Sequence, residues 1–359
     1  MENKETKTVY YEWLRLIACF LVIFNHLKGY VLYQNASGIK QICYMTISVI
    51  TKINVPLFFM VSGALLLEKQ EDIAVVFKKR VSRVCLVILL FSLGIYTECY
   101  LYALSQGREY VYTARRFFRG VIANDLDETG AYWYLYAYLG FLLLLPLFQK
   151  LAKRMGRNDF LLLFGLHFAV LSAFPLGSLF LQITGNESLL MANAFSVSPA
   201  TTAAFFYPLA GYYIDRKIDL RIISKREWTG LFAAAFGGVL LSCFCVSLDG
   251  MRDGDYLSLF DYLLATVAFL AVKYIVTIKR PALSAGKTAR VVCFCGSLTF
   301  GIYLLDHYFK LILYNGYEAM AERFMPSLFA SFGWCAVSMV LGGSVTWILK
   351  KLPLFRKLL

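Results

Sequence analysis

The chain has 359 residues, of which 59% are hydrophobic and 16% are charged, and its formal net charge is +13. Its mean hydropathy of +0.61 excludes an ordinary soluble domain and is typical of a polytopic membrane protein. Positive charge of this size also suits a nucleic-acid-binding protein, so the distribution of the basic residues along the chain has to distinguish the two classes.

About ten apolar segments are long enough to cross, as helices, a hydrocarbon core about 30 Å thick. In chain order they cover approximately residues 14–33, 43–67, 82–104, 132–149, 160–176, 198–214, 228–248, 259–278, 292–313 and 328–349. The sequence therefore predicts an all-α polytopic membrane protein in which residues 1–359 form a single membrane domain. No cluster of Cys and His has the spacing of metal ligands, so no metal site is expected.

The basic residues between these segments are unevenly distributed. The connections on the side of the N-terminus hold 24 Lys and Arg residues, and the connections on the opposite side hold 7. By the positive-inside rule, this asymmetry predicts that both termini are cytoplasmic. It also explains the positive charge through contacts with anionic membrane lipid, so no nucleic-acid partner is expected.

The first apolar segment and the residues just before it carry three ionisable side chains, Glu12, Arg15 and His26. Arg15 and His26 are separated by three helical turns plus roughly 20°, so both lie on one helix face about 16 Å apart. Glu12 precedes Arg15 by one turn. Ionisable groups at membrane depth are costly and usually face a bundle interior or a water-filled path, which makes these residues candidates for a functional site. An imidazole is also the natural general base near neutral pH.

Six short motifs follow one another along the chain. The first is Glu12-Trp-Leu-Arg15 with Asn25-His26. The others are Val55-Pro56-Leu-Phe58-Phe59-Met-Val-Ser62-Gly63, Arg80-Val-Ser-Arg83, Trp133-Tyr134-Leu135, Leu209-Ala-Gly211-Tyr212 and Phe300-Gly301-Ile-Tyr303-Leu-Leu-Asp306-His307. In content and order they resemble the signatures of the acyltransferase family 3 membrane proteins. The chain departs from the family pattern in having Glu12 where Asp is commoner, and Asp306 directly before His307.

This resemblance implies transfer of an acyl group, usually acetyl, from acetyl-coenzyme A on the cytoplasmic side to a hydroxyl of a cell-envelope glycan or lipid-linked sugar. Acyl-CoA is then a donor substrate and not a permanently bound cofactor, and the expected location is the plasma membrane of a bacterium. His26 would be the general base, Arg15 would hold the donor pyrophosphate or orient its carbonyl, and Glu12 would fix Arg15 by an ion pair. Arg80 and Arg83 would suit a phosphate of the coenzyme at the cytoplasmic edge.

Several of these residues also have structural interpretations. Arg80 and Arg83 could be boundary cations that extend toward the lipid headgroups, and His26 or His307 could join two helices by a hydrogen bond. His167 belongs to no motif and is expected to be structural. The remaining candidates for contact with substrate, or for support of groups that contact it, are Ser62, Trp133, Tyr134, Tyr303 and His307.

The connection between residues 105 and 131 interleaves apolar residues with three arginines, Arg115, Arg116 and Arg119. This pattern predicts a helix lying in the membrane interface. The segment ends on three acidic residues, Asp125, Asp127 and Glu128. It is interpreted either as a solvated loop or as part of a site that holds a sugar acceptor.

A membrane carrier of an amino acid or acyl group is the alternative function, because membrane domains that resemble this family occur fused to amino-acid racemases. Carriers often contain a matching pair of broken helices in two halves, and the sequence shows no such pair. A scaffold that only organises partners would leave Arg15 and His26 unexplained. The acyltransferase is therefore the favoured prediction.

Overall fold

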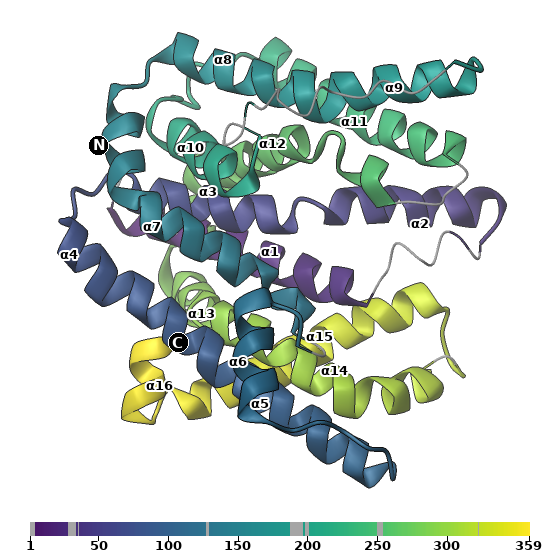
Figure 1. Ribbon diagram of the computed structural model, residues 1–359. Helices are drawn as coiled ribbons and strands as arrows, with labels where there is room; N and C mark the ends of the chain where they lie inside the picture. The colour runs from purple at the N-terminus through teal and green to yellow at the C-terminus, as the bar shows by residue number, and fades with distance from the viewer. Residues whose placement is uncertain are drawn as a thin grey trace. The chain divides into compact units, whose positions relative to one another are not determined.

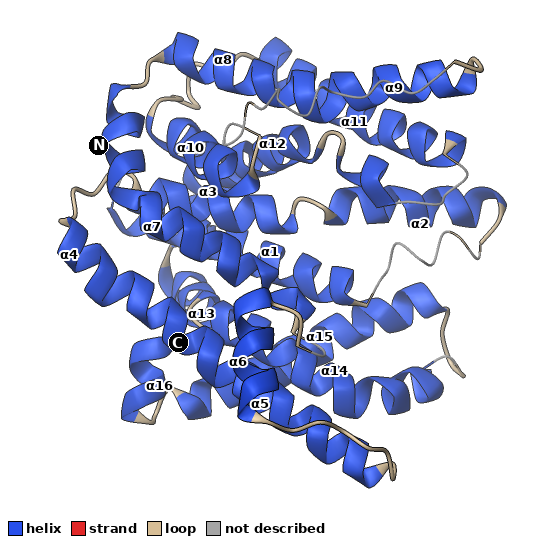
Figure 2. Ribbon diagram, in the orientation of Figure 1, coloured by secondary structure: helices blue, strands red, loops and turns tan. Residues whose placement is uncertain are grey.

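The computed structural model of the protein consists of helices and their connections (Figure 2). It describes residues 4–27, 34, 36–126, 129–186, 197, 201–249, 254–321 and 323–359. None of these residues lies in a β-strand, and 83% of them are helical. The predicted all-α fold is therefore confirmed.

The chain forms two compact units, of which unit 1 comprises Met1–Gln70 and Leu147–Gly296. Its helices are α1 (Lys4–His26), α2 (Gly38–Thr51), α3 (Asn54–Leu66), α8 (Arg157–Phe168), α9 (Phe174–Ile183), α10 (Ala203–Arg216), α11 (Lys225–Leu248), α12 (Asp261–Tyr274) and α13 (Gly286–Gly296). Short 3-10 or π turns cover Ala169–Ala173, Gly254–Ser258, Ile275–Lys279 and Pro281–Ser284.

Unit 2 comprises Glu71–Pro146 and Ser297–Leu359. Its helices are α4 (Ile73–Val76), α5 (Ser82–Ser105), α6 (Ala114–Ala123), α14 (Thr299–Ala321), α15 (Ser327–Leu349) and α16 (Pro353–Leu358). A π turn over Phe77–Val81 joins α4 to α5, and a 3-10 turn over Gly130–Tyr132 precedes α7 (Trp133–Arg154), which begins in unit 2 and continues into unit 1. The expected single domain over residues 1–359 stays a prediction.

Within the described residues, seven helical segments are long and apolar enough to cross a membrane, and an eighth is added if α13 and α14 form one span. The seven are Gly38–Leu66, Ile73–Ser105, Gly130–Arg154, Arg157–Ile183, Lys225–Leu248, Tyr256–Lys279 and Ser327–Leu349. These segments confirm a polytopic membrane protein. The count of ten spans and the cytoplasmic position of both termini stay predictions.

Several expected spans differ in detail from the described helices. The expected spans 43–67 and 292–313 are each interrupted, at Lys52–Ile53 and at Ser297–Leu298. The shortest, 160–176, lies within a helical segment of 27 residues, Arg157–Ile183, because a π turn joins α8 to α9. Helix α10 has only 14 residues, which is too few to cross the hydrocarbon core on its own. Helix α1 ends at His26, and the last expected residues of the first span, 28–33, lie outside the described residues.

Helices α3 and α10 pack closely in unit 1 (Figure 1). Gly63 of α3 faces the backbone of Pro208, and Gly211 of α10 faces the backbone of Met60, so that a Cβ on either glycine would overlap those atoms. Small residues allow membrane helices to approach to backbone contact. Two of the six motifs, Ser62-Gly63 and Gly211-Tyr212, therefore have a packing role against each other's helix.

Helix α14 packs against two other helices of unit 2. Gly301 lies against Thr346 of α15, where a Cβ would overlap the threonine side chain. The hydroxyl of Tyr308 donates a hydrogen bond of 2.6 Å to the Phe91 carbonyl of α5. Trp334 of α15 is 1% exposed and packs edge-on against the Tyr314 ring. These contacts hold α14 against both α5 and α15.

The connection between α5 and α7 contains a helix, α6, as predicted for this segment. Phe117, Gly120 and Val121 form its buried face. Phe118 and Ile122 are exposed apolar residues one turn apart, Arg115 and Arg119 are also exposed, and Arg116 is half-buried. This distribution is typical of an interfacial helix, and its position in the interface stays a prediction. Asp127 and Glu128 lie outside the described residues.

Candidate functional site

Glu12 and Arg15 form an ion pair on α1. The Nη1 atom of Arg15 lies 2.7 Å from Oε1 of Glu12, and the side chains of Arg15 and Glu12 are 32% and 11% exposed, respectively. The other carboxylate oxygen, Oε2, is buried and lies beside Gly296 of α13, where a Cβ would overlap it. The glycine thus leaves room for the carboxylate against α13, and the carboxylate in turn holds the guanidinium of Arg15.

The part of α1 just before Glu12 is bonded to a buried carboxylate on α10. Tyr10 and Tyr11 both donate hydrogen bonds from their hydroxyls to Asp215, whose side chain is 0% exposed. Arg216 lies 2.9 Å and Lys273 of α12 lies 3.7 Å from oxygens of the same carboxylate. A buried carboxylate is stable only when it is paired and hydrogen-bonded, and Asp215 meets both conditions. This group of interacting side chains was not predicted from the sequence.

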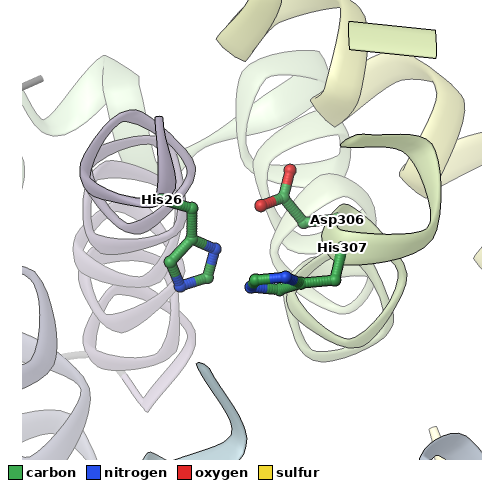
Figure 3. Close-up of side chains that lie close together, drawn as sticks. All are labelled: His26, Asp306 and His307. Atoms are coloured by element: carbon green, nitrogen blue, oxygen red, sulfur yellow. The ribbon is translucent and has the colours of Figure 1, made fainter. Parts of the chain in front are cut away.

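His26 is the last residue of α1 and is half-buried (Figure 3). The side chain of its neighbour Asn25 accepts a hydrogen bond of 3.4 Å from Nζ of Lys52. Lys52 lies at the interruption between α2 and α3, inside the expected span 43–67. Lys52 was not among the predicted site residues, although a charged residue within an apolar span is itself a signal of function.

Ser62 of α3 donates its hydroxyl to the carbonyl of Phe58, four residues earlier in the same helix, at 2.8 Å. This is the usual back-bonding of Ser within a membrane helix. Together with the contact of Gly63 on Pro208, it assigns the Ser-Gly pair a local structural role. Contact of Ser62 with substrate stays a prediction.

Arg80 and Arg83 have separate partners in unit 2. Arg80 forms a bidentate pair with Glu71 through Nε and Nη2, each 2.7 Å from a carboxylate oxygen. Arg83 donates from Nε to the Leu358 carbonyl at 2.9 Å, and its guanidinium lies 5.9 Å from the centre of the Phe300 ring. These contacts hold both side chains in place and leave part of each guanidinium fork unused. Binding of coenzyme phosphate stays a prediction.

Two of the motifs contact each other in unit 2. The hydroxyl of Tyr303 donates to the Ala131 carbonyl at 2.6 Å, and the hydroxyl of Tyr132 donates to the Leu304 carbonyl at 2.8 Å. The rings of Tyr134 and Tyr303 pack edge to face with centroids 5.8 Å apart. Trp133 beside them is 48% exposed. The tyrosines thus join the start of α7 to α14 and leave Trp133 available at the surface.

His307 and Asp306 are consecutive residues of α14, and their side chains leave the helix in different directions (Figure 3). Asp306 is 1% exposed and accepts a hydrogen bond of 2.6 Å from Ser338 of α15. His307 is 8% exposed. Asp306, which departs from the family pattern, therefore has a partner within the same unit. The role of His307 stays a prediction.

His167 is 1% exposed in α8, and its ring stacks on Phe206 of α10 with centroids 3.7 Å apart. Tyr207 and Tyr262 pack edge-on against the same imidazole. This aromatic environment agrees with the structural role expected for His167.

These features define a class of protein, a polytopic all-α membrane protein with ionisable side chains buried among its helices. A family model described as an acyltransferase domain matches residues 8–350, nearly the whole chain. The chain therefore belongs to the acyltransferase family 3 and is a membrane acyltransferase. No curated protein and no solved structure matches it.

Proposed function

We propose that this acyltransferase moves an acyl group, in the first instance acetyl, from acyl-CoA on the cytoplasmic side to a hydroxyl of a cell-envelope glycan or lipid-linked sugar. The observation that carries the proposal is the Glu12–Arg15 ion pair on the same helix as His26. The pair leaves several N–H groups of Arg15 for the pyrophosphate or carbonyl of the donor. His26 lies about 16 Å further along that helix, at the depth of a thioester that enters from the cytoplasm.

The reaction needs one proton acceptor. The imidazole of His26 takes the proton from the acceptor hydroxyl, and the hydroxyl oxygen attacks the carbonyl carbon of the thioester. The carbon–sulfur bond then breaks, and the coenzyme A thiolate leaves and takes the proton from the imidazolium. The products are the acylated sugar and coenzyme A, and His26 returns to its neutral form.

The remaining candidates are assigned by their contacts. Arg80 and Arg83 are proposed to bind a phosphate of the coenzyme with the N–H groups that their present partners do not use. Trp133 and Tyr134 are proposed to stack on a sugar, with Tyr303 supporting Tyr134. Ser62 and His307 are proposed as further contacts or supports of the acceptor.

Mass spectrometry of envelope glycans tests the proposal directly. Cells with the gene should show acyl groups on a glycan or lipid-linked sugar that cells without the gene lack. His26→Ala should abolish these groups while the protein still assembles, because loss of one imidazole leaves no unpaired buried charge. Wild-type acylation in the His26→Ala variant would overturn the assignment of His26 as the base.

A carrier is the second candidate, and helix interruptions favour it. Helices α2 and α3 are separated at Lys52–Ile53, and α13 and α14 are separated at Ser297–Leu298. Interrupted helices form the binding sites of many carriers. Uptake of labelled amino acid or acetate by proteoliposomes, without transfer of acetyl from acetyl-CoA to any glycan, would favour this function.

A further inference from the structure

Lys52 lies at the midpoint of a membrane span. The helical segment Gly38–Leu66 has 29 residues, and Lys52 is fourteen residues from each end. At about 1.5 Å per residue, the lysine is roughly 21 Å from either end of the segment, and hence at mid-depth. Its side chain is half-buried. A cation at this depth is costly, so such residues either pair with an opposite charge or act in function.

Two groups of unit 1 contact or attract the ammonium of Lys52. Asn25, near the end of α1, accepts its hydrogen bond. Asp261, the first residue of α12, attracts it electrostatically and also accepts a hydrogen bond of 2.7 Å from the hydroxyl of Tyr207. Lys52 is therefore placed between the end of α1 and the start of α12.

The C-terminal end of α1 needs stabilising contacts from outside the helix. The last carbonyl groups of a helix have no partner within the helix, and the final turn frays unless other groups hold it. A cation near a helix C-terminus also interacts favourably with the partial negative charge there. Lys52 supplies that charge together with a hydrogen bond to Asn25, which immediately precedes His26.

We propose that Lys52 is a positioning residue for acyl transfer, which holds Asn25 and thereby fixes the last turn of α1 and the imidazole of His26. This inference rests on the proposed function, in which His26 is the base. The competing explanation is that Lys52 only neutralises Asp261. The two explanations differ in what happens when both charges are removed together.

The decisive variant is the double substitution Lys52→Met with Asp261→Asn. It removes the cation and the anion together, so no unpaired charge remains in the membrane, and the new amide oxygen would still accept the hydrogen bond of Tyr207. The full-length protein is expressed in cells, its folded fraction is measured by size-exclusion chromatography, and envelope glycan acylation is measured by mass spectrometry per folded protein. Binding of acetyl-CoA to the purified protein is measured by calorimetry.

We expect the double variant to assemble and bind acetyl-CoA like the wild type but to lose acylation on the order of 100-fold, because a small misplacement of a catalytic group has this effect. Lys52→Arg keeps the charge and should recover part of the activity. Lys40→Met, a substitution of an exposed lysine on α2, should have no effect. Wild-type acylation in the double variant would show that Lys52 only neutralises Asp261 and would overturn the proposal.

A second variant covers the case in which the double variant does not fold. Asn25→Leu keeps both charges and removes the side-chain amide that accepts the hydrogen bond of Lys52, so it should produce the same loss of acylation, and wild-type acylation would overturn the proposal. His26→Ala is measured in parallel. If His26→Ala is active, the proposed function fails, whereas loss in His26→Ala with full activity in Asn25→Leu rejects only the positioning role of Lys52.

Discussion

Gly63 and Pro208 lie backbone against backbone where α3 meets α10, and Gly211 repeats this contact on Met60. The carbonyl of Pro208 occupies the space that a side chain at Gly63 would need. The two glycines belong to separate sequence motifs, and these two backbone contacts explain why both helices need a residue without a Cβ at these positions. The contact fixes α10, which carries Asp215, the residue that anchors the start of α1.

We expect Gly63→Ala to destabilise the protein by about 1–3 kcal/mol, the usual cost of adding atoms to a packed site. The measurement is thermal unfolding of the purified protein in detergent, with Gly211→Ala tested in the same way. Gly165→Ala in α8 is the control, because no atom lies within 4 Å of a Cβ there. That change should be neutral or slightly stabilising, since Ala favours a helix more than Gly does. Equal melting temperatures for all three variants would contradict the packing role.

Gly296→Ala should reduce acylation although it changes no ionisable group. The new methyl group would overlap the Glu12 side chain, and displacement of Glu12 would release Arg15 from its ion pair. Glycan mass spectrometry per folded protein is the measurement, and Gly230→Ala in α11, where a Cβ meets open space, is the control. Should Gly296→Ala acylate like the wild type, the Glu12–Arg15 pair has no part in the reaction.

Arg83→Gln should weaken binding of acetyl-CoA by on the order of 1.5–3 kcal/mol if the guanidinium donates to a charged phosphate. Arg83→Lys should recover only part of this loss, because lysine lacks the planar fork. Calorimetry on the purified protein measures the affinity, with Lys79→Gln, an exposed neighbour, as control. Unchanged affinity after replacement of both Arg80 and Arg83 by Gln would reject the proposed donor contact.

The contact of Arg83 with the Leu358 carbonyl allows a second test of the same residue. A chain that ends at Leu352 lacks α16 and frees Arg83 from this contact. If Arg83 binds the donor directly, the shortened protein should bind acetyl-CoA at least as well as the full chain. If Arg83 acts only by holding α16, shortening the chain should weaken binding as much as Arg83→Gln does.

Tyr303→Phe should destabilise the protein by about 1–3 kcal/mol, because it removes the hydrogen bond to the Ala131 carbonyl and leaves that group without its donor. Thermal unfolding measures the loss, and Tyr102→Phe, at an exposed position of α5, is the control. A melting temperature equal to that of the wild type would show that the link between α14 and the turn before α7 is dispensable.

The parts of the structure that depend on local sequence were predictable. The ion pair of Glu12 with Arg15 follows from their spacing of one turn, and α6 follows from its alternation of arginines and apolar residues. The break at Lys52–Ile53 was not predicted, because the apolar run continues through it and Pro56 in the first turn of α3 is compatible with a helix.

Partners that are distant in the sequence were not predictable either. Asp306 obtains its hydrogen bond from Ser338, 32 residues later, and Asp215 obtains its bonds from tyrosines more than 200 residues earlier. The periodicity of apolar and polar residues within one helix cannot indicate a pairing between residues of distant helices. Lys52 and Lys273 were overlooked for a different reason, since the basic residues were counted only in the connections between the spans, where they determine topology.

The tyrosine, aspartate and backbone contacts of α14 restrict the movement of this helix within unit 2. Within six residues, Tyr303 to Tyr308, this helix is bonded to the turn before α7, to α15 and to α5. A tilt or slide of α14 would break several of these bonds at once, so we expect α14 to move together with the helices that it is bonded to. His307 lies inside this restrained stretch. A change in the direction of its imidazole within unit 2 is therefore expected to come from rotation about its own side-chain bonds rather than from movement of the helix.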